Sequence, residues 1–284
     1  MSSAGQPGAA IFPGWTVAPF SLSRFAAVSP FRPIRWPYVR AAVAALLALL
    51  ATSSVAVADL ARPETSVAAL PLIIVPARAT TTPAAGDVMV VLLSADGGWA
   101  RLDQEVARNL SREGIPVVGW NTLSYYAHRR TPAQASRALA MVMRHYGTLW
   151  NRPRVLLVGY SFGADVLPLL YNRLPPELRA QVTGVALLGL SGDAEFEFHL
   201  QDWVERTVGP RYATLPEVRR IRGIPLLCAH GQADHTSVCE RIGTPNTLLF
   251  VTRSGHSLGS VASPVSTQLL KEIHAMPRLD GDDR

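Results

Sequence analysis

A tight five-residue turn, Gly159–Gly163, joins a segment typical of a buried strand to a segment with helical spacing, and it constrains the fold more than any other feature. The turn reads Gly-Tyr-Ser-Phe-Gly, the run Arg154–Gly159 before it is largely apolar, and a helical pattern follows over Phe162–Arg173. Such a turn projects the side chain of Ser161 above a sheet, and its glycines are needed because backbone passes close to backbone. The helix that follows directs N–H groups and a positive dipole end to the same place. We therefore expect Ser161 to be a nucleophile, with an ordinary surface serine on a tight turn as the alternative.

Short apolar runs alternate with helical periods along the rest of the chain. The runs are apolar at consecutive positions, which is typical of parallel strands that helices cover on both faces. This alternation predicts an α/β fold with a mostly parallel sheet, and the serine turn specifies the α/β-hydrolase fold. Thr131 and Gln134 flank Pro132 in a capping-box pattern that predicts the start of a helix. The expected strands are Ala69–Val75, Val88–Leu93, Ile115–Trp120, Arg154–Gly159, Val182–Leu190, Ile224–Ala229 and Thr247–Thr252, and the last helix is expected near Ser263–Met276.

The N-terminal residues 1–58 have the pattern of an extension that ends in a signal peptide. Arg35 and Arg40 precede the apolar run Ala41–Ala51, and Ala56–Ala58 reads Ala-Val-Ala, a cleavage pattern of signal peptides. An uncleaved anchor in the inner membrane, facing the periplasm, is one alternative, and a buried helix is another. We expect the protein to be periplasmic.

Composition divides the remainder of the chain and excludes one class of partner. Residues 59–86 are rich in Pro, Ala and Thr and read as a linker with one early strand, and residues 87–284 form the expected α/β-hydrolase domain. Within that domain, Phe196–Arg222 is a longer insertion that could partly cover a site. Four of the six excess positive charges lie in residues 1–58, and no basic stripe interleaved with aromatic residues follows. We therefore expect no nucleic-acid partner.

A serine nucleophile needs a base, and the base needs an acid that orients it. In the α/β-hydrolase fold the chain order is serine, acid, histidine. Of the seven histidines, His256 alone lies in a loop after the last expected strand. Asp234 follows the preceding expected strand and is the leading acid, with Asp193 as the competitor. Asp165, four residues after Ser161, is expected to be a structural hydrogen-bond partner.

The oxyanion of an acyl-transfer intermediate needs two N–H donors. We expect one from the backbone of Phe162 and the other from Asp96, in the loop after the first long strand, with Gly97 as the next candidate. Gly97 and Tyr160, which flank these donors, are expected to contact substrate. The Asp96 side chain has two interpretations: it attracts a cationic group, or it caps a helix that begins at Gly98. The cap is the favoured one.

Cysteine usage agrees with export. Cys228 and Cys239 are the only two cysteines, with ten residues between them. In an oxidising compartment we expect them to form a disulfide, and two unrelated buried thiols are the alternative. The sequence has no phosphate-binding loop, no His-Glu-x-x-His and no Cys-x-x-Cys, so we expect no metal ion and no cofactor.

Several longer runs resemble a family of bacterial virulence proteins, VirJ and AcvB. They are SADGGWARLDQEVARNLSREGIPVVGWNTLSYY, RTPAQ, GYSFGADVLPLLYNRLP and LLGLSGDAEFEFH, and the similarity covers Val88 to Gly259. The resemblance implies an exported α/β-hydrolase linked to type IV secretion and, for AcvB-like members, to hydrolysis of lysyl-phosphatidylglycerol. By position it places the nucleophile on Ser161, the histidine on His256 and the acid on Asp234. Ala95 stands where the family pattern has Gly.

These features together predict an exported serine hydrolase of the esterase type. Its substrate is expected to be a lipid or small-molecule ester, with aminoacyl-phosphatidylglycerol such as lysyl-phosphatidylglycerol as the candidate that the resemblance suggests. Contact with the membrane surface and with secretion-system proteins is expected to accompany that function. The alternative is a non-catalytic periplasmic scaffold that keeps the fold and works by contacting the secretion system, because a fold does not fix a function.

Overall fold

The computed structural model describes residues 66–80, 86–196, 211–258 and 262–275. The expected signal peptide, Met276 at the end of the last helix, and residues 197–210 of the longer insertion lie outside these described residues. The described residues belong to one compact unit, Arg62–Arg284. None of their helices is both long enough and apolar enough to cross a membrane.

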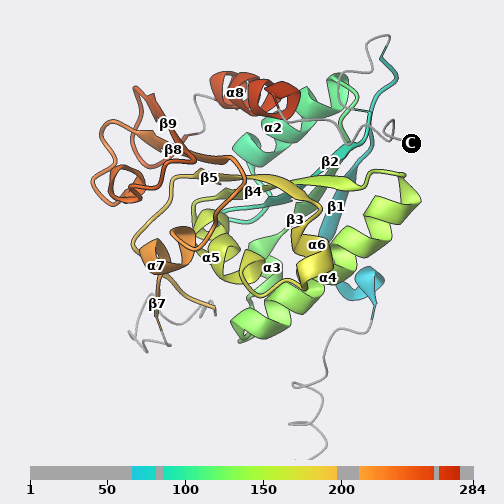
Figure 1. Cartoon of the computed structure of the whole chain (residues 1–284), viewed down its shortest axis with the longest axis horizontal. Coiled ribbons are helices and arrows are strands. Elements are labelled where there is room, and N and C mark those ends of the chain that lie inside the picture. The colour runs from blue at the N-terminus through green and yellow to red at the C-terminus, as the bar shows by residue number, and fades with distance from the viewer. Residues whose placement is uncertain (1–65, 81–85, 197–210, 259–261, 276–284) are drawn as a thin grey trace, which may run out of the picture. The chain divides into compact units, whose positions relative to one another are not determined.

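Seven strands form one twisted sheet, in which only one strand runs against the others (Figure 1). In order across the sheet they are β1 (Leu72–Val75), β3 (Val117–Trp120), β2 (Val88–Leu93), β4 (Arg154–Tyr160), β5 (Val182–Leu188), β8 (Leu226–Gly231) and β9 (Thr247–Thr252). The edge strand β1 pairs with β3 in the antiparallel sense, and every other neighbouring pair is parallel. The expected α/β architecture with a mostly parallel sheet is thus confirmed.

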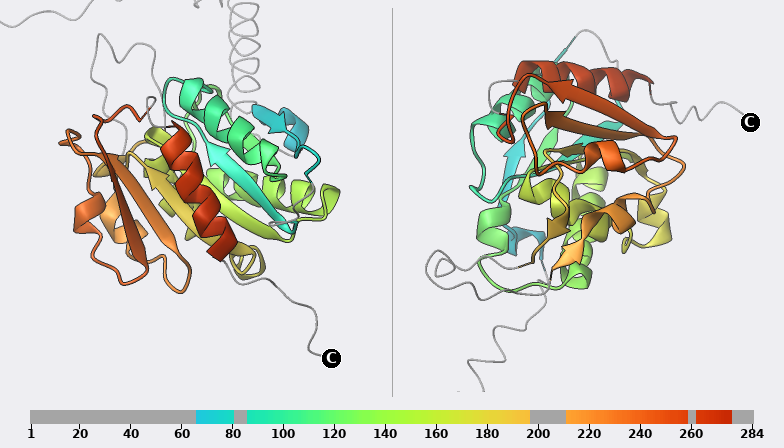
Figure 2. Two further views of the ribbon diagram at one scale, coloured as in Figure 1. Left: turned by 90° about the horizontal axis from the view of Figure 1, so that it is seen from above. Right: turned by 90° about the vertical axis from the view of Figure 1, so that its left-hand side faces the viewer.

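Helices cover both faces of this sheet. One face carries α2 (Arg101–Arg112) and α8 (Ala262–Ala275), which lie next to each other (Figures 1 and 2). The other carries α3 (Thr122–Tyr125), α4 (Pro132–Leu149), α5 (Phe162–Tyr171), α6 (Pro176–Arg179) and α7 (Thr214–Val218). Two separate clusters of buried apolar side chains result, one on each side. The central strands β2 and β4 are buried along their whole length, which explains their uninterrupted apolar sequences.

The observed elements differ from the expected ones mainly at their ends. Leu72–Val75, in the segment expected to be a linker, contributes β1 to the sheet. A short antiparallel pair that the sequence pattern does not reveal, β6 (Asp193–Ala194) with β7 (Tyr212–Ala213), forms a separate two-stranded sheet. Two single 3₁₀ turns, η1 (Val67–Ala69) and η2 (Cys239–Arg241), complete the described elements.

The start of α4 agrees with the expected capping box, whereas the start of α2 requires a correction. Gln134 N–H donates to Thr131 Oγ1 at 3.2 Å, and the Gln134 side chain accepts the Thr131 N–H at 2.8 Å. Helix α2 begins at Arg101 and not at Gly98, because the Asp103 carboxylate accepts the N–H of the N-cap residue Ala100 at 3.0 Å. The carboxylate three residues into the helix therefore does the capping.

Candidate active site

Ser161 occupies the sharp turn between β4 and α5, in a backbone conformation that is rare for a residue with a side chain. Its φ is 51° and its ψ is −116°, and its N–H donates to the carbonyl of Leu188 at 2.7 Å. A Cβ on Gly159 would collide with the backbone of Gly163, and one on Gly163 would collide with the carbonyl of Leu93. The turn therefore tolerates only glycine at these two positions, as the sequence pattern predicts.

Ser161, His256 and Asp234 are joined by two hydrogen bonds in series. The Ser161 Oγ lies 2.9 Å from His256 Nε2, and His256 Nδ1 lies 2.9 Å from Asp234 Oδ2. The Asp234 side chain is almost fully buried, at 1% exposed, whereas 41% of the His256 side chain is exposed. The arrangement holds the imidazole between a hydroxyl on one nitrogen and a buried carboxylate on the other.

Thr236 holds the second oxygen of the Asp234 carboxylate. Its N–H and its Oγ1 donate to Asp234 Oδ1 at 3.0 and 2.6 Å. Burial alone would raise the pKa of Asp234, but the hydrogen bonds from Thr236 and His256 outweigh it and lower that pKa below its ordinary value. The carboxylate is therefore held in its charged form, which favours a proton on His256 Nδ1.

The loop that carries His256 passes directly over the end of β8. A Cβ on Gly231 would collide with the backbone carbonyls of Ser254 and Gly255. The N–H of Ala233 donates to the carbonyl of Ser254 at 3.0 Å. The absence of a side chain at Gly231 thus allows the two loops to meet, and their contact sets the height of His256 above the sheet.

A disulfide joins Cys228 in β8 to Cys239 in η2. Both cysteines are buried, and the residues between them include Asp234 and Thr236. In the chain-entropy model a cross-link across a loop of this size stabilises the fold by about 3 kcal/mol. The disulfide therefore closes the loop that presents the acid.

Tyr160, for which the sequence predicts a contact with substrate, is mostly buried, and its hydroxyl is directed toward the His256 loop. Burial raises the pKa of its hydroxyl, and interactions with the side chain of Ser257 and the backbone of Leu258, the two residues after His256, oppose that rise. The ring belongs to the same buried cluster as Leu258. Tyr160 thus connects the strand before Ser161 to the chain just after the imidazole.

A cavity of about 310 Å³ opens beside the Ser161 hydroxyl. It is lined by Asp96, Ser161, Phe162, Asp165, Ser191, Asp193 and Glu195. The two expected oxyanion residues, Phe162 and Asp96, therefore lie at this cavity with the serine. Gly97 and Tyr160 are not among its lining residues in the described part of the chain. Asp193, the competing acid, lines the cavity, whereas Asp234 is the carboxylate bonded to His256.

The loop that carries Asp96 is anchored by Thr122. The Thr122 Oγ1 lies 2.9 Å from the carbonyl of Ser94 and 2.8 Å from that of Ala95. The Asp96 carboxylate accepts the N–H of Gly97 at 3.0 Å and caps no helix. The favoured interpretation of Asp96 as a helix cap is therefore wrong, and its exposed side chain is at the cavity instead.

Asp165, one turn after Ser161 on α5, is the expected structural hydrogen-bond partner. It is 7% exposed, and its Oδ1 accepts the N–H of Ser191 at 2.7 Å. Ser191 in turn forms a backbone bridge with Ser237, in the loop that carries Asp234. Asp165 therefore links the helix of the serine to the loop of the acid.

Burial, opposed by the hydrogen bonds from Ser191 and assisted by the nearby charges of Asp193 and Asp96, raises the pKa of Asp165 to about 8. Because the folded chain holds this proton more tightly than the unfolded chain, Asp165 contributes stability that is present below about pH 4. That contribution is lost as the pH rises to about 8. In Asp165→Asn we expect a shallower decline of the free energy of unfolding between these pH values, by up to about 1.4 kcal/mol per pH unit.

Urea unfolding at several pH values measures this difference. Glu113→Gln, at an exposed acid after α2, is the matched control and should decline with pH as the original chain does. Parallel pH profiles for Asp165→Asn and the original chain would contradict a buried proton on Asp165.

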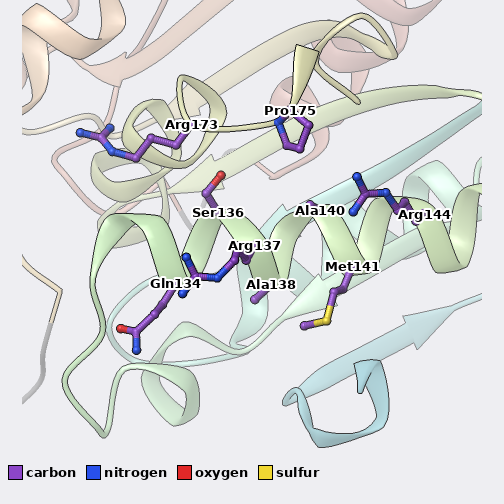
Figure 3. Close-up of a pocket in the computed structure, with 9 residues that line it drawn as sticks. All are labelled: Gln134, Ser136, Arg137, Ala138, Ala140, Met141, Arg144, Arg173 and Pro175. Atoms are coloured by element: carbon purple, nitrogen blue, oxygen red, sulfur yellow. The ribbon is translucent and has the colours of Figure 1, made fainter. Parts of the chain in front are cut away.

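A second cavity, of about 400 Å³, lies between α4 and the chain after α5 (Figure 3). Figure 3 shows Arg137, Arg144 and Arg173 around it, and no expected site residue lines it. Arg144 pairs with Glu177 at 3.0 Å and Arg173 with Glu217 at 3.4 Å. Among the described residues, no group of three or more His, Cys, Asp or Glu side chains is placed to hold a metal ion.

Comparison with models of protein families shows to which family the chain belongs. The model of the bacterial virulence protein VirJ matches residues 87–276, well over half of the sequence. The chain belongs to the VirJ family. No curated protein is significantly similar to this VirJ-family chain in sequence.

Solved structures share its fold at low sequence identity. The esterase domain of a Rhodothermus marinus protein has a TM-score of 0.52 and 16% identity, over 73% of this chain and 93% of that one. MenH from S. aureus has a TM-score of 0.52 and 14% identity, over 71% and 97%. Est1E from Butyrivibrio proteoclasticus has a TM-score of 0.52 and 13% identity, over 71% and 93%. The VirJ-family chain therefore has the α/β-hydrolase fold.

Two residues of the site, Thr236 and Glu195, are not among those predicted from the sequence. Thr236 stands two residues after Asp234, where an aspartate side chain often accepts hydrogen bonds from the following turn, so this local signal was present. Glu195 at the cavity had no such signal, because only the β6–β7 pairing brings it there.

Proposed function

We propose that this VirJ-family chain is a serine esterase in which Ser161, His256 and Asp234 act together. The observation that carries the proposal is the pair of 2.9 Å hydrogen bonds that runs from the serine hydroxyl through the imidazole to a buried carboxylate. This is the geometry that activates a serine for acyl transfer. The serine also opens onto a cavity, so a substrate carbonyl has room to reach it.

In the proposed reaction the Ser161 Oγ attacks the ester carbonyl while His256 Nε2 takes its proton. The tetrahedral intermediate collapses, the C–O bond to the alcohol breaks, and His256 returns the proton to the leaving oxygen. Water then repeats the sequence on the acyl-serine and releases the acid. Asp234 keeps the Nδ1 proton in place and stabilises the imidazolium that forms in each half. The backbone N–H groups of Phe162 and Asp96 are the proposed donors to the oxyanion.

The charge of the cavity favours a cationic acyl group. Four acidic side chains line it, but Asp165 is protonated below about pH 8 and Glu195 pairs with Arg211 at 2.8 Å. Asp96 and Asp193 remain as exposed carboxylates beside the serine. A field of this sign raises the local concentration of a cation. An aminoacyl ester carries an ammonium group next to its carbonyl, and a lysyl ester carries a second one.

We therefore propose aminoacyl-phosphatidylglycerol, with a lysyl group as the leading case, as the substrate class. The signal-peptide pattern in residues 1–58 supports action in the periplasm, at the outer surface of the inner membrane. Contact with secretion-system proteins would then be an additional role of the same exported domain.

Labelling with a fluorophosphonate tests the nucleophile directly. We expect the purified protein to be modified at Ser161, as located by mass spectrometry, and we expect His256→Ala to abolish the modification. Circular dichroism should show that the variant is folded. Failure of the folded original chain to react would favour the scaffold function instead.

Charge removal at the cavity tests the substrate class. Asp96→Asn together with Asp193→Asn should raise KM for lysyl esters by roughly tenfold, since two exposed charges each contribute up to about 1 kcal/mol. A neutral acyl ester of the same alcohol is the control substrate, and its KM should not rise. An equal loss with both substrates would count against a cationic acyl group while leaving the esterase proposal intact.

Tyr160→Phe removes one hydroxyl that interacts with the chain after His256. A polar contact of this kind contributes about 1 kcal/mol, so we expect kcat to fall about fivefold. KM should change little, because Tyr160 does not line the cavity. Steady-state kinetics separates the two effects; a rise in KM with unchanged kcat would instead indicate that Tyr160 contacts substrate.

A further inference from the structure

The strand β9 forms an apolar edge of the sheet. It reads Thr-Leu-Leu-Phe-Val-Thr, carries no charge and no proline, and in the described part of the chain pairs only with β8 (Figure 2). Leu248, Leu249 and Val251 are 43%, 42% and 50% exposed. Natural edge strands usually carry charges, prolines or bulges that prevent pairing. β9 has none of these protections.

The direction of its backbone groups follows from two hydrogen bonds. Leu226 N–H donates to the carbonyl of Asn246, and Gln232 N–H donates to the carbonyl of Thr252, each at the end of the β8–β9 ladder. Successive residues of a strand direct their N–H and C=O groups to opposite sides. The even-numbered residues of β9 therefore face β8, and Thr247, Leu249 and Val251 face the free edge.

Two residues of that edge have both backbone groups available. The N–H of Thr247 already donates to the carbonyl of Thr244 at 3.1 Å. Within the described residues, Leu249 and Val251 make no hydrogen bond on the outer side of β9. The edge thus offers two N–H donors and two C=O acceptors on residues two positions apart.

We propose that β9 pairs with β9 of a second copy of this chain, antiparallel, about a two-fold axis at Phe250. In this register Leu249 faces Val251 of the second copy, and Val251 faces its Leu249. Each pair exchanges two N–H···O=C bonds, so all the available groups on both edges are used. A register centred on Leu249 would require the N–H of Thr247, which is already engaged. The two sheets join into one, with an isologous interface.

The side chains fit this register as well. The four exposed side chains of the two Leu249–Val251 pairs lie together on one face of the joined sheet, where they contact one another and each becomes less exposed to water. Arg253 lies opposite Thr247 of the second copy, so no like charges meet. At the opposite edge of the sheet, β1 is only four residues long and exposes Ile74 at 41%, which makes it a matched control.

Sedimentation velocity over a concentration series tests the proposal. The sample is the full protein in the mature form that its host produces. The original chain should sediment as a dimer. Leu249→Lys with Val251→Lys places like charges opposite each other and should weaken the dimer by more than about tenfold, whereas Ile74→Lys should leave it unchanged. Thermal unfolding confirms that each variant is folded.

A charge-complementary pair tests the register. Leu249→Lys with Val251→Glu places each lysine opposite a glutamate of the second copy, so this variant should remain dimeric. A monomeric original chain, or a dimer that persists with two lysines, would overturn the proposal. A folded but monomeric Leu249→Lys, Val251→Glu variant would overturn the register, and dissociation of Ile74→Lys would overturn the assignment to β9.

Discussion

His256→Ala is expected to lower kcat for ester hydrolysis by about 10⁵-fold, and Asp234→Asn by about 10⁴-fold, with both variants folded. The larger loss follows from removing the group that takes and returns the proton. The smaller one follows because asparagine keeps the shape of Asp234 but can no longer fix the proton on Nδ1 and stabilise the imidazolium. Steady-state kinetics on a soluble ester measures both, and the free energy of unfolding checks the fold.

Asp193→Asn is the matched control for the acid. Asp193 is also a carboxylate after a neighbouring strand, but it lines the cavity and is not the carboxylate bonded to His256. Its kcat on a neutral ester should stay within a few-fold of the original. A larger loss in Asp193→Asn than in Asp234→Asn would reverse the assignment of the acid.

Gly231→Ala is expected to damage both activity and stability, although the substitution adds only one methyl group. The Cβ would collide with the carbonyls of Ser254 and Gly255, which are backbone atoms with no rotamer through which to yield. Forcing the two loops apart should cost about 1–3 kcal/mol of unfolding free energy. Because a misplacement of about 1 Å can cost roughly 10²-fold, kcat should fall by about that factor as His256 moves.

Gly192→Ala provides the comparison, since a Cβ there would make only an ordinary 3.7 Å contact with Val238. Urea unfolding and kcat, measured on both variants, separate the effect of the backbone collision at Gly231 from the general effect of replacing a glycine by alanine. Equal, small losses in both would show that the loop over β8 adapts and that Gly231 does not set the position of His256.

The fold could be predicted from the sequence because its signals are local. Strands such as β2 and β4 are covered on both faces, so their sequences are apolar without interruption. The glycines at positions 159 and 163 indicate that the backbone passes close to itself within these five residues. By contrast, β6 and β7 are two residues long and are defined only by their pairing across the insertion, which no local pattern records.

The sequence predicts which residues form the site better than it predicts the contacts that those residues make. Chain order within the fold singled out Ser161, Asp234 and His256, and the structure brings these three together. The roles of Tyr160 and Asp96 were not predictable, because both depend on contacts with residues distant in the sequence. Tyr160 meets a loop about one hundred residues later, and the capping role expected of Asp96 was taken by Asp103.

The backbone conformation of Ser161 lowers the stability of the fold. With φ at 51° and ψ at −116°, it occupies a region in which a Cβ is unfavourable, typically by about 1–3 kcal/mol, and glycine would relieve that cost. A chain selected only for its contacts with other proteins would gain stability by drifting to glycine here. Ser161 therefore holds its hydroxyl beside His256 at a cost in stability, which the proposed nucleophile requires and a protein–protein contact does not.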